Sequence, residues 1–142
     1  MNTEIGLYQQ NLLAHHKNPI GFKKQISVTH SADGDNAVCG DEITVEVNIS
    51  AGKIQALAFL GDSCAICRAS ASMMCQYLLD QSIDNIEDLI KIPMALINGV
   101  HEADVTLDEC FSSLTVIEKY PVRKQCALLP WQTLISAINK NP

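Results

Sequence analysis

Three cysteines lie at positions in the sequence where their thiols could do chemistry. Cys64 follows a strand-like run (residues 54–60) and Gly61, and it precedes a helix-like run (residues 65–79). Free backbone N–H groups and the positive end of the helix dipole favour negative charge at a helix start, so a thiol there should lose its proton more readily. The thiolate is the form that binds metal or attacks sulfur. Cys39 and Cys126 also lie at junctions between predicted elements, and we expect the fold to bring them to Cys64.

A carboxylate and a fourth cysteine extend this set. Asp41 follows Cys39 by two residues, and three thiolates with one carboxylate suit a tetrahedral zinc ion. Thiolates equally suit an iron–sulfur cluster. Cys67 forms a CxxC pair with Cys64 and is a candidate extra thiol, although a single CxxC is a weak signal. Cys75 is more typical of a small buried hydrophobic residue.

Composition limits the classes of function. With 142 residues, 47% of them apolar, the chain is predicted to form a single domain over residues 1–142. The net charge of −6 argues against nucleic acid or an anionic membrane as partner. We see no signal peptide and no apolar run approaching the roughly 18 residues that span a bilayer, and therefore expect a cytoplasmic protein. Cysteines in that compartment stay reduced, which favours metal or sulfur chemistry over disulfides.

The sequence pattern predicts an α+β fold. Alternating or apolar runs predict strands at residues 25–31, 43–49 and 54–60, with turns at 31–36 and 50–53. Helices are expected at residues 7–16, 65–79, 86–90, 93–97, 107–117 and 122–138. Within the last helix, Pro130 predicts a kink or a break.

The order of the strands predicts how the cysteines meet. Three consecutive strands with short links favour an antiparallel meander. In a meander the start of the second strand and the end of the third lie at the same edge, which places Cys39 near Cys64. Cys126 joins them if the last helix crosses that edge.

Three segments of the sequence resemble motifs of the U-type iron–sulfur assembly proteins, the group of SufU, IscU and the NifU N-terminal domain. They are Asn36-Ala-Val-Cys-Gly-Asp41, Gly61-Asp-Ser-Cys-Ala-Ile-Cys-Arg-Ala-Ser-Ala-Ser-Met-Met74 and Pro121-Val-Arg-Lys-Gln-Cys-Ala-Leu-Leu-Pro-Trp131. The stretch 99–120 resembles the insertion that separates SufU proteins from IscU proteins. The likeness extends over nearly the whole chain and is greatest to the SufU branch.

This resemblance implies a three-stranded antiparallel sheet with helices packed on it and a metal site at one exposed end. By position it implies that Cys39, Asp41, Cys64 and Cys126 hold zinc. It also implies that Cys39 accepts persulfide sulfur from a cysteine desulfurase of the SufS type, that Arg123 helps that contact, and that sulfur passes to downstream iron–sulfur assembly or acceptor proteins.

The sequence departs from the family's pattern at three positions. Ala37 replaces a proline, Cys67 stands where serine is common, and Gln125 stands where IscU proteins carry a ligand histidine and SufU proteins usually a lysine. Because glutamine is a poor ligand for iron or zinc, a histidine-completed cluster site is disfavoured. The leading interpretation is therefore a zinc-dependent sulfurtransferase. A scaffold for a transient [2Fe–2S] cluster and a purely structural zinc domain that binds a protein partner stay open as alternatives.

Overall fold

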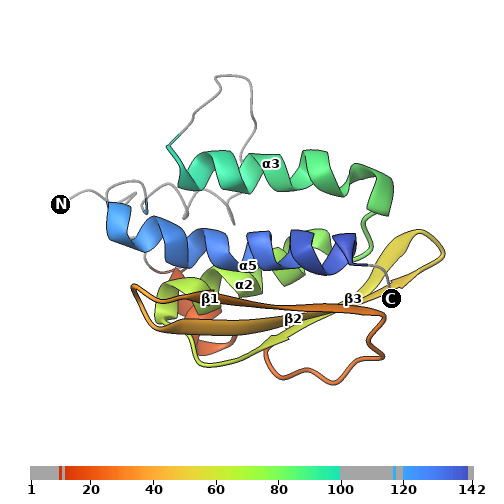
Figure 1. Ribbon diagram of the computed structural model, residues 1–142, viewed down its shortest axis with the longest axis horizontal. Helices are drawn as coiled ribbons and strands as arrows, with labels where there is room; N and C mark the ends of the chain where they lie inside the picture. Colours follow the sequence, from red (N-terminus) through yellow and green to blue (C-terminus); the bar gives the residue numbers. More distant parts are fainter. Residues whose placement is uncertain (1–9, 11, 100–116, 118–119, 141–142) are drawn as a thin grey trace.

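The structure is a computed structural model that describes residues 10, 12–99, 117 and 120–140 (Figure 1). Its elements are β1 (His30–Asn36), β2 (Asp41–Ser50), β3 (Lys53–Leu60), α2 (Ala65–Leu78), the short 3-10 helix η1 (Ile83–Asn85), α3 (Ile86–Ile97) and α5 (Pro121–Asn139). Residues 10 and 12–17 are also helical, which agrees with the described part of the helix predicted at residues 7–16. Ile117 apart, the predicted helix 107–117 lies outside the described residues.

The three strands form one antiparallel sheet in the order β1–β2–β3. Ala51 and Gly52 connect β2 to β3 with positive φ values of 53° and 73°, as in the two-residue turns that suit the twist of a hairpin. Asn36 pairs with Asp41 and Thr44 pairs with Leu60, so the end of β1, the start of β2 and the end of β3 share one edge. The predicted meander is confirmed.

The helices form layers on one face of the sheet (Figure 1). Helix α5 lies along β1 and β2, α2 packs beside α5, and α3 contacts α5 on the side away from the sheet. Along β2, the buried residues Ile43, Val45 and Val47 alternate with more exposed ones, as expected for a strand with one covered face. The largest fully buried side chains of this core include those of Ile54, Phe59, Met73, Met74, Leu78 and Trp131. The predicted α+β fold is confirmed.

The position of the first strand was predicted wrongly. The sequence pattern placed it at residues 25–31 and read residues 31–36 as a turn, whereas β1 spans His30–Asn36 and residues 25–28 have no regular structure. Gly34 explains the difference. A Cβ atom at Gly34 would collide with the Thr133 hydroxyl of α5, so this glycine lets a helix approach the strand closely and does not mark a turn.

Both helix-internal prolines are accommodated within continuous helices. Helix α3 includes Pro93 and joins the two short helices that were predicted there, and α5 includes Pro130. Of the two alternatives predicted at Pro130, a kink or a break, the break is therefore wrong. Pro130 is itself buried beside the fully buried Trp131, so tertiary packing outweighs the hydrogen bond that a proline removes. None of the helices described here is long and apolar enough to cross a membrane.

Candidate functional site

Cys64 occupies the N-cap of α2, as its sequence position predicted. Its backbone is extended (φ −71°, ψ 168°), and its Sγ accepts a hydrogen bond from the Cys67 N–H at 3.5 Å. The Cys64 N–H donates to Oδ1 of Asp41 at 2.7 Å. The aspartate therefore joins the start of β2 to the start of α2, and its negative charge lies where a helix N-terminus favours it.

Cys39, Asp41 and Cys126 come together although they are far apart in sequence. The thiol sulfurs of Cys39 and Cys126 and a carboxylate oxygen of Asp41 all lie within 4.8 Å of one another. Cys126 Sγ donates to Cys39 Sγ at 2.9 Å, and Cys64 Sγ donates to Asp41 Oδ2 at 3.8 Å. The four predicted site residues thus form one contiguous cluster, in which Cys64 adjoins the other three through Asp41.

Two glycines shape the edge of the sheet that carries the cluster. Gly40, between Cys39 and Asp41, has a φ of 71°, and Gly61, just after β3, has a φ of 127°. A Cβ atom at Gly61 would collide with the carbonyl oxygen of Glu42, while the Glu42 N–H donates to the Asp62 carbonyl at 2.9 Å. The link from β3 to α2 is consequently held tightly against the start of β2, which brings Cys64 to Asp41.

A buried hydrogen-bond network fixes Cys126 against α2. The Ser70 hydroxyl of α2 donates to the Ala127 carbonyl of α5 at 2.6 Å and accepts from Trp131 Nε1 at 2.9 Å. Ala127 follows Cys126 directly, so these bonds anchor the turn of α5 that carries the thiol. Helix α5 therefore crosses the edge of the sheet that carries the cysteines, which was the condition for Cys126 to join Cys39 and Cys64.

Asn36 is a member of the site that the sequence pattern did not single out. Its Nδ2 donates to Cys126 Sγ at 3.6 Å, and its Oδ1 accepts the Val38 N–H at 3.3 Å. The asparagine therefore supports both the loop that carries Cys39 and the thiol of Cys126. The sequence pattern placed Asn36 at the end of the predicted turn 31–36. Asn side chains commonly bond the backbone two residues on, but the contact with α5 could not be seen from the sequence.

The environment of Asp41 fits a bound cation. Its side chain is only 1% exposed, and a buried carboxylate is normally paired with a cation or bound to a metal. Within the described part of the chain, the one ion pair joins Lys91 and Asp88 on α3, so no basic side chain there neutralises Asp41. Thiols and a carboxylate within reach of a common point are a donor set that suits zinc or iron.

The surroundings of the Cys126 thiol raise its pKa. Burial raises the pKa of Cys126 above its usual range, and hydrogen bonds with Cys39 and Asp41 raise it further. The exposed guanidinium of Arg123 lies one turn earlier, and its pKa is raised by a hydrogen bond with Cys126 and by the nearby sulfurs of Cys64 and Cys39. Binding of a metal here must release thiol protons, because thiolates are the ligands.

The candidate extra thiol, Cys67, lies outside the group of three. It is fully buried, and burial raises its pKa to about 12, so the thiol remains protonated near neutral pH. Its side chain belongs to the hydrophobic core, which favours a packing role. Gln125, the residue that stands where IscU proteins carry a ligand histidine, has an exposed side chain on α5.

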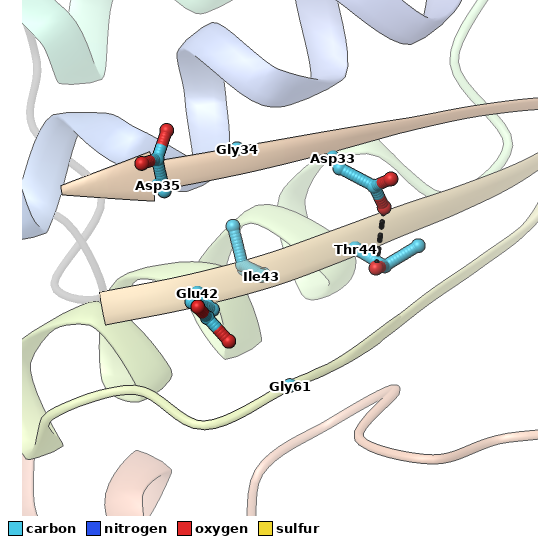
Figure 2. Close-up of a pocket in the computed structure, with 7 residues that line it drawn as sticks. All are labelled: Asp33, Gly34, Asp35, Glu42, Ile43, Thr44 and Gly61. Carbon is cyan, nitrogen blue, oxygen red and sulfur yellow. Dashed lines mark hydrogen bonds between the residues drawn. The ribbon is translucent and has the colours of Figure 1, made fainter. Parts of the chain in front are cut away.

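An acidic hollow lies on the sheet close to the same edge (Figure 2). It is lined by Asp33, Gly34, Asp35, Glu42, Ile43, Thr44 and Gly61. Thr44 Oγ1 donates to Asp33 Oδ1 at 2.6 Å, whereas the carboxylates of Asp35 and Glu42 do not converge on a common point in Figure 2. We therefore assign no ligand to this hollow.

Comparison with known proteins identifies the family. Residues 7–142 match the NifU-like N terminal domain. The chain is 31% identical to the zinc-dependent sulfurtransferase SufU of Bacillus subtilis (strain 168) over 135 residues, which cover 94% of this chain and 90% of that protein. It is 32% identical to the iron–sulfur cluster assembly scaffold protein IscU of Thermotoga maritima over 108 residues, which cover 76% of this chain and 75% of that protein.

The fold comparison agrees with the sequence comparison. A crystal structure from Fervidobacterium islandicum AW-1, described as an iron–sulfur cluster assembly scaffold for the SUF system, superposes with a TM-score of 0.79. It is 26% identical in sequence, and the match covers 94% of this chain and 97% of that one. The chain belongs to the NifU-like N-terminal domain family and is an iron–sulfur cluster assembly protein of the SufU and IscU group.

Proposed function

We propose that this protein is a zinc-dependent sulfurtransferase that accepts persulfide sulfur from a cysteine desulfurase during iron–sulfur cluster assembly. The observation that carries the proposal is the cluster of Cys39, Asp41 and Cys126 within 4.8 Å, with the Cys64 thiol in contact with Asp41. These four residues would hold the zinc. When bound, zinc keeps thiols deprotonated and protected until the partner arrives.

Cys39 is the proposed sulfur acceptor. Its side chain is partly exposed, Cys64 is similarly accessible at the N-cap of α2, and Cys126 is fully buried. A thiolate at Cys39 that attacks the outer sulfur of a desulfurase persulfide takes over that sulfur, and the desulfurase cysteine leaves as a thiolate. Cys39 also lies in the loop between β1 and β2, next to the highly exposed Val38.

The surface around Cys39 supports docking of a protein partner. An open hollow of about 650 Å³ is lined by Val38, Cys39, Tyr120, Pro121, Val122 and Arg123. Val38, Val122 and Tyr120 are 81%, 65% and 54% exposed, an unusual degree for apolar side chains gathered around one cysteine. In this proposal Arg123 adds a positive charge that attracts the partner's anionic persulfide.

The relatives' names support both leading interpretations. The match to a protein named as a zinc-dependent sulfurtransferase covers 94% of this chain, and the match to one named as an IscU scaffold covers 76%. Gln125, a poor metal ligand, favours the sulfurtransferase over a cluster site completed by histidine. The scaffold for a transient [2Fe–2S] cluster is the alternative.

The test compares the zinc-loaded wild type with Cys39→Ala in the presence of a SufS-type cysteine desulfurase and L-cysteine. We expect the wild type to stimulate alanine production and to gain the mass of one sulfur atom at Cys39, and we expect the variant to do neither. Cys75→Ala is the matched control, because Cys75 is buried in the core away from the cluster. Unchanged stimulation in Cys39→Ala would reject the assignment.

Metal analysis separates the two interpretations. About one zinc per chain without sulfide favours the sulfurtransferase. Iron with equimolar sulfide and visible absorption after anaerobic purification would favour the scaffold instead.

A further inference from the structure

The thiols of Cys39 and Cys126 are the closest sulfur pair in the site. Their Sγ atoms are 2.9 Å apart, and both cysteines are free. A disulfide bond requires a separation of about 2.05 Å, so the two sulfurs need only a small further approach. The loop that carries Cys39 contains Gly40, whose Cβ position is open space, so nothing packs against the loop at that point.

The two thiols differ in their access to solvent. Cys126 is fully buried, whereas Cys39 is partly exposed. The Cys126 thiol lies 2.9 Å from Cys39 Sγ, the atom that becomes the inner sulfur when a persulfide forms on Cys39. A thiolate within contact distance of the inner sulfur of a persulfide can attack that sulfur and break the sulfur–sulfur bond.

We propose that Cys126 is a resolving thiol that releases the sulfur accepted by Cys39 as hydrosulfide. This inference rests on the proposed function, because it begins from a persulfide on Cys39. In the metal-free chain, a reductive step then follows sulfur acceptance. The product of this step is sulfide, whereas direct transfer to another protein would keep the sulfur at the oxidation level of a persulfide.

The step balances within the protein. The Cys126 proton passes to the terminal sulfur of the Cys39 persulfide, and the resulting Cys126 thiolate attacks Cys39 Sγ. A bond forms between the two Sγ atoms, and the bond between Cys39 Sγ and the terminal sulfur breaks. The terminal sulfur, which now carries that proton, leaves with the bonding electron pair as HS⁻. The two cysteines are oxidised to a disulfide and the transferred sulfur is reduced to sulfide, so one turnover needs no outside reductant. A second turnover needs a dithiol to reduce the disulfide.

The surrounding structure holds Cys126 in place for this attack. Asn36 Nδ2 donates to its sulfur at 3.6 Å, and the Ser70 hydroxyl fixes the next residue, Ala127, at 2.6 Å. Cys126 also has the 2.9 Å contact with Cys39 Sγ, whereas the side-chain contact of the Cys64 thiol at 3.8 Å is with Asp41. The geometry therefore selects Cys126 over Cys64 as the resolving thiol.

The experiment loads the reduced, metal-free full-length protein with inorganic polysulfide under anaerobic conditions and removes the excess reagent. Released sulfide is then measured, and the disulfide is mapped by mass spectrometry of peptides. We expect about one sulfide per Cys39–Cys126 disulfide. Cys126→Ala should keep the persulfide on Cys39 and release sulfide only at background level, while Cys75→Ala should behave as the wild type.

The outcomes that would overturn the inference can be measured in the wild-type protein. The test therefore remains valid even if Cys126→Ala does not fold. A stable persulfide on Cys39 without a disulfide would overturn it, and so would a Cys39–Cys64 disulfide. Sulfur transfer from the desulfurase to Cys39 is measured separately. If the desulfurase fails to deliver sulfur while polysulfide still yields the Cys39–Cys126 disulfide, the proposed function fails and the resolving chemistry stands.

Discussion

At the residue scale, the buried carboxylate of Asp41 links helix capping to the candidate metal site. One carboxylate oxygen accepts the Cys64 N–H, and the other lies 3.8 Å from the Cys64 sulfur. The same side chain belongs to the group formed with Cys39 and Cys126. A single residue therefore orients one thiol and supplies an oxygen ligand for the metal that we propose.

Replacing Asp41 by asparagine separates these two roles. Asn retains an oxygen that can accept the Cys64 N–H but loses the negative charge, so we expect the protein to fold and to bind zinc more weakly. Loss of residues that merely support metal ligands costs about 10–100-fold in affinity, and loss of a direct ligand charge should cost at least about 10-fold. Competition with a chromophoric chelator measures the change.

The matched control is Asp62→Asn, which alters an exposed aspartate two residues before Cys64. Its backbone carbonyl, which binds the Glu42 N–H, is unaffected by the change. Equal zinc affinities of Asp41→Asn and wild type would exclude Asp41 as a ligand.

At the element scale, the junction from β3 to α2 sets the distance between Cys64 and Asp41. Gly61 has a φ of 127°, and its Cα lies so close to the Glu42 carbonyl that no Cβ atom fits there. The turn at Gly52 also has a positive φ, of 73°, but has open space around it. Alanine substitutions at these two positions therefore distinguish the cost of backbone strain, which both share, from the cost of a steric clash, which arises only at Gly61.

We expect Gly61→Ala to destabilise the fold more than Gly52→Ala. A residue other than glycine in a sparsely populated backbone conformation costs about 1–3 kcal/mol, and this cost applies at both positions. At Gly61 the clash with Glu42 adds to that cost and displaces the start of α2. Urea unfolding measures the difference in free energy of unfolding, and zinc affinity should fall only in Gly61→Ala. Equal destabilisation by the two substitutions would contradict the close packing at this junction.

At the scale of the whole molecule, the candidate metal site lies at the margin of the core: Cys126 belongs to the core, and Cys39 and Cys64 pack against it. Most of the largest buried side chains, among them Trp131, Phe59 and Met73, lie outside the four candidate ligands and are contributed by the sheet and by α2, α3 and α5. A core of this kind should fold without metal, in contrast to domains whose folding energy is the metal-binding energy. This argues against the purely structural zinc domain.

Metal removal tests this distinction. We expect the zinc-free protein to keep its helical circular-dichroism spectrum and to melt cooperatively at a lower temperature. A ligand at 1,000 times its dissociation constant adds about 4 kcal/mol of stability, which for a domain of this size corresponds to a shift of about 10 °C. Addition of zinc should restore the melting temperature, and magnesium should not, because thiolates bind it poorly. Loss of the helical spectrum on chelation would instead support a structural zinc domain.

The features that the sequence determined by itself depend either on neighbouring residues or on the order of the strands. The alternation of β2, the turn at Ala51 and Gly52, and the position of Cys64 at a helix start depend on neighbouring residues. Because a meander has short links, strand order then placed Cys39 near Cys64.

What only the tertiary structure decided depends on contacts between distant segments. Gly34 reads as a turn residue until Thr133 of α5 is packed on it, and Pro130 reads as a helix breaker until it is buried in the core. The contact of Asn36 with Cys126 and the burial of Cys67 likewise follow from how α5 and α2 lie on the sheet. Local propensity is a weak energy term, and the burial of apolar surface outweighs it wherever the two disagree.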